Sequence, residues 1–283
     1  FLSGGIDSSL ITTLMQKESI NPIQTFTIGF HDNRYNEAEN AKLISGHLST
    51  NHTELYVGPE EALEIIPSLS DIYDEPFADS SQLPTSIVSS LTRKYVTVAL
   101  SGDGGDELFA GYTRYYWANL INNKFYKIPL SIRKMLASSI ELPPNKFWES
   151  LFQFLPSTKN MPRVSERVGK FANFLREPNA DALYRNQHSH WLNPENIILN
   201  STEPRGIPFD DDLTSEIPNF ITRMQFMDSV TYLPDDILTK LDRASMAVGL
   251  EARVPMLDHR VVEYSWKIPQ RMKFRDGISK WLP

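Results

Sequence analysis

FLSGGIDSS, residues 1–9, is the stretch that decides how this chain folds. Two apolar residues lead into a Ser-Gly-Gly turn, and apolar residues between positions 10 and 15 then recur with helical spacing. The pattern therefore predicts a strand, a loop and a helix. Gly4 and Gly5 allow backbone amides to converge on an anion, such as phosphate, at the positive end of that helix. Because Asp7 would repel a bare phosphate, the loop predicts a phosphate group accompanied by a divalent cation.

A second loop of the same type follows a short apolar run at residues 96–100, which is typical of a strand buried in a parallel sheet. Its sequence, SGDGGDE at residues 101–107, again joins serine, glycines and acids ahead of a helical segment. In an open parallel sheet, ligands gather beyond the carboxyl ends of the strands, so both loops are expected to face one crevice. Asp7 and Asp106 would then share a metal ion.

Strands and helices alternate over the first hundred residues, which predicts an α/β layer structure around a parallel sheet. The expected strands cover residues 23–30, 52–57 and 96–100, and the expected helices cover residues 37–48 and 83–95.

Residues 117–220 differ from the rest of the chain, because they are rich in aromatic and basic residues and contain no convincing strand. They predict a helical insertion. We therefore expect a single domain over residues 1–283, with its core at about 1–116 and 221–283.

A last informative block begins at residue 233, where acids and then apolar residues at helical spacing lead to Gly249. This pattern predicts a helix that the glycine ends. Asp242 lies one step off the apolar face of this helix. The following segment, LEARVP at residues 250–255, places charges in an apolar setting.

Composition favours a cytoplasmic protein that acts on small molecules. The 283 residues are 41% hydrophobic and 22% charged, with no cysteine and a formal net charge of -7. No apolar run reaches the roughly 20 residues of a membrane helix, and no signal peptide is recognisable. The negative charge argues against a nucleic-acid partner. Since the chain starts at Phe1 inside an expected strand and stops without a closing signal, we expect a fragment of a longer protein.

The opening loop resembles the Ser-Gly-Gly-x-Asp-Ser loop of the ATP pyrophosphatase (PP-loop) group, which has an adenine nucleotide alpha hydrolase-like fold. Together with LSGDGGDELFAGY at residues 100–112, and with DRASM followed by LEARVPMLD at residues 242–258, it resembles the synthetase domain of glutamine-dependent asparagine synthetases. The resemblance spans nearly the whole chain and is weakest between about 122 and 219. It implies ATP-dependent conversion of aspartate to asparagine through an acyl-adenylate, with AMP and pyrophosphate released.

The resemblance also implies the roles of individual residues and the cofactors ATP and Mg²⁺. Asp7 and Asp106 would hold the metal, and Asp103, Tyr112 and Asp242 would act on the acyl-adenylate or in the substrate pocket. The implied ATP-binding residues are Leu2, Ser3, Gly4, Gly5, Asp7, Ser8, Ile28, Ser101 and Gly102.

Two features of this family are expected to lie outside the chain. One is the N-terminal glutaminase domain, whose nucleophile is a cysteine and which would supply ammonia. The other is a C-terminal tail with a catalytic lysine, a role that we do not assign to Lys280. The fragment is therefore expected to bind nucleotide but to be incomplete for catalysis. The oligomeric state is left open, with a homodimer as one option.

Two other functions fit the same residues. One keeps the fold and the adenylation chemistry but changes the substrate, as in β-lactam formation, lasso-peptide ring closure or sugar-acid amidation. The other is a module that binds nucleotide without turnover. At single residues the alternatives are structural: a solvated acidic turn for Asp103, Asp106 and Glu107, a packed tyrosine for Tyr112, and an ion pair for Asp242.

Overall fold

The structure is a computed structural model that describes residues 1–31, 36–154, 164–189, 196–198, 200–202, 206–210, 212–275 and 278–282. Its contacts divide the chain into two compact units, one made of residues 1–112 and 225–283 and the other of residues 113–224. The expected division into a core and an insertion stays a prediction.

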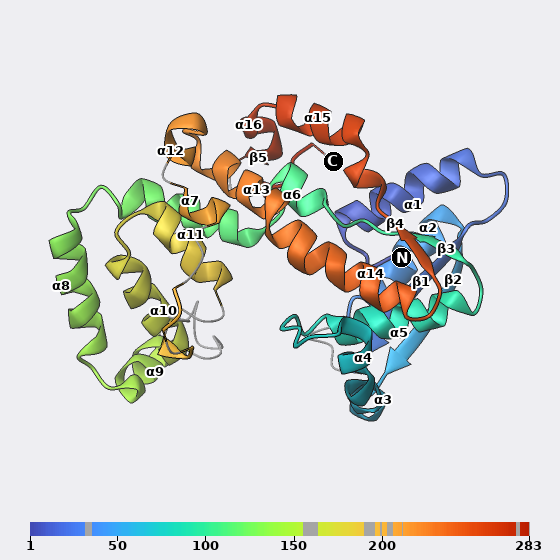
Figure 1. The fold of residues 1–283 in the computed structure, drawn as a ribbon, viewed down its shortest axis with the longest axis horizontal. Helices are drawn as coiled ribbons and strands as arrows, with labels where there is room; N and C mark the ends of the chain where they lie inside the picture. Colours follow the sequence, from blue (N-terminus) through green and yellow to red (C-terminus); the bar gives the residue numbers. More distant parts are fainter. Residues whose placement is uncertain are drawn as a thin grey trace. The chain divides into compact units, whose positions relative to one another are not determined.

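The first unit is a helix-rich α/β structure with small parallel sheets (Figure 1). Strand β1 (Gln24–Phe30) pairs in parallel with β2 (Asn51–Val57), and β3 (Val98–Leu100) pairs in parallel with β4 (Glu251–Arg253). A short antiparallel pair, β5 (Phe274–Arg275) and β6 (Ile278–Ser279), lies near the C-terminus. The predicted strands at 23–30, 52–57 and 96–100 are confirmed, with small shifts at their ends.

The first two residues connect the parallel pairs. The backbone N–H of Leu2 donates to the carbonyl of Phe26 in β1 at 3.0 Å, and the amine of Phe1 donates to the carbonyl of Leu100 in β3 at 2.7 Å. Because a strand can bond neighbours on both edges, these contacts place residues 1–2 between β1 and β3. The first loop therefore leaves the sheet beside the loop that follows β3.

Helices surround these strands, and the helices predicted at 37–48 and 83–95 are confirmed as α2 and α5. Ahead of β3 the helices of this unit are α1 (Ile6–Glu18), α2 (Ala38–Leu48), α3 (Pro59–Ile65), η1 (Ile66–Ser68), α4 (Leu69–Tyr73) and α5 (Gln82–Arg93). After β3 come α6 (Gly105–Phe109), η4 (Leu233–Leu238), α14 (Thr239–Met246), η5 (Pro255–Leu257), α15 (His259–Lys267) and α16 (Gln270–Lys273).

The predicted helix at 233–249 is present in two parts. Residues 233–238 form η4, a π-helical turn that contains Pro234, and α14 continues from it. Proline has no N–H to donate, and such π turns inside helices are often found at functional sites. Gly249 adopts the left-handed conformation (φ 68°) just beyond the helix, as the sequence predicted for its end. Helix α14 packs against α5 (Figure 1).

The regular elements of the second unit within the described residues are helices, joined by loops. Its elements are α7 (Thr113–Lys124), α8 (Leu130–Glu141), α9 (Asn145–Phe154), α10 (Val164–Arg176), α11 (Ala180–His188), η3 (Ile207–Phe209) and α12 (Leu213–Glu216). Helix α13 (Phe220–Val230) begins in this unit and ends in the first. Helices α8 and α10 pack on each other around Ala137, Ala172 and Leu175.

None of the helices within the described residues combines the length and the apolar character that crossing a lipid bilayer requires.

Candidate functional site

The two glycine-acid loops lie directly against each other. A Cβ atom on Gly102 would stand 2.8 Å from the backbone nitrogen of Ser8, and one on Gly105 would stand 2.5 Å from Oδ1 of Asp7. Real Cβ atoms do not approach backbone so closely, so glycine is required at position 102 for the loops to touch. The prediction that the two loops face one site is confirmed.

The first loop is a tight turn held by its own serines. Gly4 adopts a left-handed conformation (φ 82°) that favours glycine. The hydroxyl of Ser8 accepts from the backbone N–H of Ser3 at 3.2 Å and lies 3.0 Å from the Ser3 hydroxyl, which in turn accepts from the N–H of Gly5 at 3.2 Å. These bonds set the entry into α1, whose first residue is Ile6.

A cavity of about 540 Å³ opens where the loops meet, and every residue that lines it belongs to the first unit. Most of the predicted site residues line it, namely Ser3, Gly5, Asp7, Ser8, Ser101, Gly102, Asp103, Asp106 and Tyr112.

Four predicted residues do not line this cavity. Leu2 is 1% exposed and packs in the core, Gly4 lies against α2, and Ile28 is half-buried in β1. Asp242 is exposed on α14, on the turn that follows the cavity-lining Lys240 and Leu241. The structure therefore does not bring Asp242 to the cavity with the other predicted residues.

Asp7 and Asp106 come together across the ammonium of Lys280. The Nζ atom of Lys280 forms an ion pair with Oδ2 of Asp7 and lies 2.7 Å from Oδ1 of Asp106. Burial tends to lower the pKa of this lysine, but the two carboxylates outweigh it and raise the pKa. Lys280 thus belongs to the site, although the sequence interpretation left it out. It lies 273 positions from Asp7, so no local pattern indicates the contact.

The residues present fit a divalent cation shared by Asp7 and Asp106. Oδ1 of Asp7 is buried and has no hydrogen-bond partner, and burial raises the pKa of this carboxyl. An orphaned buried oxygen is costly unless a ligand satisfies it. No group of three or more His, Cys, Asp or Glu suited to a metal exists among the described residues. Two carboxylates suffice for Mg²⁺, which takes its remaining ligands from phosphate and water.

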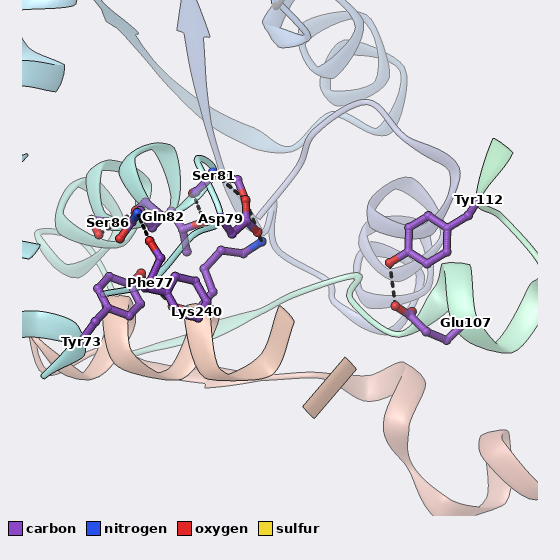
Figure 2. Close-up of polar contacts among 10 residues, drawn as sticks. Tyr73, Phe77, Asp79, Ser81, Gln82, Ser86, Glu107, Tyr112 and Lys240 are labelled. Carbon is purple, nitrogen blue, oxygen red and sulfur yellow. Dashed lines mark hydrogen bonds and ion pairs between the residues drawn. The ribbon is translucent and has the colours of Figure 1, made fainter. Parts of the chain in front are cut away.

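Of the other acids of the second loop, Asp103 is half-buried and Glu107 is buried. Asp103 accepts from the Ser101 hydroxyl at 2.5 Å, and burial raises its pKa. Glu107 is 1% exposed, and burial raises its pKa to about 7 even though the Tyr112 hydroxyl donates to it at 2.6 Å (Figure 2). The reading of Glu107 as part of a solvated turn is wrong. Glu107 and its neighbour Asp106 are both acids of one loop, so the sequence does not show that Glu107 is buried while Asp106 is more exposed.

A charged cluster that the sequence interpretation missed lines the same cavity. Lys240 of α14 lies 2.5 Å from Oδ2 of Asp79 and 2.6 Å from the Ser81 hydroxyl (Figure 2). The other carboxylate oxygen of Asp79 accepts from the Ser81 N–H at 2.8 Å and from its hydroxyl at 2.7 Å. Burial alone would raise the pKa of Asp79, but the bonds from Lys240 and Ser81 lower it to about 2.

The chain is similar in sequence to known asparagine synthetases. The family model described as asparagine synthase matches residues 1–283. The chain is 32% identical to asparagine synthetase [glutamine-hydrolyzing] 1 of Bacillus subtilis, over 100% of this chain and 42% of the relative. It is 30% identical to a putative asparagine synthetase of Mycobacterium bovis (99% and 40%) and 31% identical to the asparagine synthetase of Gallus gallus (99% and 34%).

The chain therefore spans about two fifths of the length of the curated relatives that it matches first. The match covers both glycine-acid loops and the segments that carry Lys240 and Lys280. This chain belongs to the asparagine synthase family.

Proposed function

We propose that this chain is the synthetase part of a ligase that activates a carboxylate with ATP and converts it to an amide, with an ATP pyrophosphatase-type core. The observation that carries the proposal is the meeting of two glycine-acid loops at one cavity. There Asp7 and Asp106 face each other across the ammonium of Lys280. The family to which the chain belongs supports the same chemistry.

The reaction has two steps. An oxygen of the acceptor carboxylate attacks the α-phosphorus of ATP, and pyrophosphate leaves with the electrons of the broken P–O bond. Ammonia then attacks the acyl carbon, and AMP leaves with the electrons of the acyl C–O bond while the nitrogen loses a proton. Negative charge accumulates on the phosphate of the leaving group in both steps, pyrophosphate in the first and AMP in the second, so preorganised positive groups are expected to lower both barriers.

The chain's own residues would hold the reactants in place. Ser3, Gly5 and Ser8 line the cavity at the first turn of α1, where helix geometry favours pyrophosphate. Leu2, Gly4, Ile28, Ser101 and Gly102 complete the proposed nucleotide site. Asp103 and Tyr112 face the same cavity and are proposed to contact the acyl-adenylate. Asp242 is exposed on α14, so we propose for it only a position at the rim of the cavity.

Asp7 and Asp106 would hold Mg²⁺, which when bound neutralises phosphate charge. Lys280, which pairs with both carboxylates, would supply a second positive charge at this site.

The acceptor that we propose is aspartate, with asparagine as the product. The names of the relatives support this choice. Another acceptor, such as a β-lactam precursor, a lasso peptide or a sugar acid, is the alternative, and a nucleotide-binding module without turnover is the second. Neither is favoured by the comparisons.

We further propose that ammonia comes from a glutaminase domain outside these 283 residues, which contain no cysteine nucleophile. The reaction uses small cytoplasmic metabolites, so we place the protein in the cytoplasm. A homodimer remains one option for its assembly, and light scattering tests it.

Exchange of labelled pyrophosphate into ATP tests the function. In the full-length protein, exchange should appear with aspartate and fall by about 10²–10³-fold in Asp7→Asn, because a charged group at the phosphates is lost. The matched control is Asp74→Asn, which makes the same chemical change at an exposed carboxylate that does not line the cavity. Exchange with a uronic acid and none with any amino acid would reject aspartate, and failure to bind Mg-ATP would reject the synthetase.

A further inference from the structure

We propose that Lys240 and Asp79, oriented by Ser81, form the subsite that recognises the acceptor as an α-amino acid: Lys240 binds its α-carboxylate and Asp79 its α-ammonium. This inference rests on the proposed function, and it narrows the acceptor to a zwitterion with a second, reacting carboxylate.

The first support is position. Asp79 and Ser81 precede α5, Lys240 lies in α14, and all three side chains line the cavity that also contains Asp103 and Tyr112. Figure 2 shows Lys240 reaching from α14 to Asp79 and Ser81, with Tyr112 and Glu107 as a separate hydrogen-bonded pair. An acceptor held at Lys240 would therefore share the cavity with the loops that are proposed to bind ATP.

The second support is charge. Five acids line the cavity, namely Asp7, Asp79, Asp103, Asp106 and Glu107. Lys240 is the only lysine or arginine among its described lining residues. A carboxylate substrate entering such a cavity meets repulsion unless a cation receives it. Lys240 is the cation placed to do so, since its side chain is only 11% exposed and cannot easily turn to solvent.

The third support is unused bonding capacity. An ammonium has three protons, and Asp79 and the Ser81 hydroxyl accept two of them. On Asp79, Oδ1 accepts twice from Ser81 while Oδ2 accepts only from Lys240. One donor and one acceptor of opposite charge therefore remain side by side, which is the arrangement that complements an ammonium and a carboxylate on one carbon atom.

A structural role is the competing explanation, because the pair also ties the segment before α5 to α14. The molecule contains a matched control for it. Arg243 of the same helix pairs with Asp74 of the same segment at 2.5 Å, but both are exposed and neither lines the cavity. Arg243→Met removes an ion pair between the same two segments and leaves Lys240 and Asp79 unchanged.

Three acceptors separate the two explanations in the pyrophosphate exchange assay. β-Alanine is aspartate without its α-carboxylate, and succinate is aspartate without its ammonium. We expect Lys240→Met to reduce the preference for aspartate over β-alanine by about tenfold, the effect of one charge-assisted hydrogen bond. Asp79→Asn should reduce the preference for aspartate over succinate by a similar factor. Preference is measured as a ratio of kcat/KM, or of inhibition constants for an acceptor that does not react.

Each variant leaves one buried charge without its partner, so the double variant D79N/K240M provides a check on folding. It should bind Mg-ATP within about threefold of the wild type and lose both preferences. Arg243→Met should keep both. Equal loss of activity with all three acceptors, or unchanged preferences, would overturn the inference while leaving the proposed function intact. Absence of exchange with every acceptor in the wild-type protein would reject the proposed function, and this inference with it.

Discussion

Buried charges serve different ends in the two units of this chain. In the second unit, Arg133 is 3% exposed and donates to the carbonyls of Ile128, Leu175, Glu177 and Pro178. Its guanidinium also lies 4.3 Å from the centre of the Tyr126 ring. In the first unit, Asp7 has an oxygen without a partner, and Glu107 has a pKa raised by burial. Charges that are fully paired within the protein hold a fold together, whereas charges left partly unpaired at a cavity prepare a binding site.

The largest effect on stability is expected at Arg133. Arg133→Met would leave several carbonyls without donors, and the free energy of unfolding should fall by about 3 kcal/mol. Affinity for Mg-ATP, measured well below the melting temperature, should not change. Denaturant unfolding and calorimetry together test this prediction. A variant that is as stable as the wild type, or that binds Mg-ATP much less tightly, would contradict the division of roles.

Glu107 should make the stability of the first unit depend on pH. Its pKa of about 7 lies above the ordinary 4.5, so the folded state keeps a proton that the unfolded chain has released between these values. Its contribution to stability is therefore complete below pH 4.5 and is lost as pH rises through 7. Glu107→Gln cannot ionise and should be more stable than the wild type at pH 8, by about 2 kcal/mol.

The two proteins should have similar stability at pH 4.5. Parallel pH profiles of unfolding for the wild type and Glu107→Gln would show that the carboxyl is not buried as the structure has it.

Two glycines should respond in opposite directions. Gly102→Ala would press a Cβ atom against the backbone of Ser8 at 2.8 Å, so it should lower the free energy of unfolding by about 1–2 kcal/mol and weaken ATP binding. Gly46→Ala lies in α2 with nothing within 4 Å, so it should raise stability by about 0.5–1 kcal/mol. Thermal unfolding of both variants tests the contrast, and a Gly102→Ala protein as stable as Gly46→Ala would argue against contact between the loops.

Local patterns in the sequence predicted the two loops, the strands β1 to β3 and the helices α2, α5 and α14. The glycines and acids of residues 1–9 and 101–107 mark the ends of strands. The structure shows in addition that the two loops touch at Gly102. The sequence of the second unit also lacks strand-like runs, and its described elements are helices.

The contacts of two lysines with distant acids could not be predicted in this way. Lys280 reaches Asp7 across 273 positions, and Lys240 reaches Asp79 across 161. Lysines are usually exposed, so nothing in their local sequence marks these two as paired with acids of the site. For Asp242 the pattern identified the helix correctly, but this side chain, one position off the apolar face, is exposed to solvent while Lys240 lines the cavity. Which side chains of α14 face the cavity depends on how this helix packs against α5.

We propose that Asp7 and Asp106 share a cation that is bound with the phosphates of ATP. Calorimetric titration with ATP, with and without Mg²⁺, tests it most directly in the wild type, Asp7→Asn and Asp106→Asn. We predict that Mg²⁺ strengthens ATP binding to the wild type by at least about tenfold and that each substitution removes most of this gain. A gain from Mg²⁺ that is as large in Asp106→Asn as in the wild type would contradict the account.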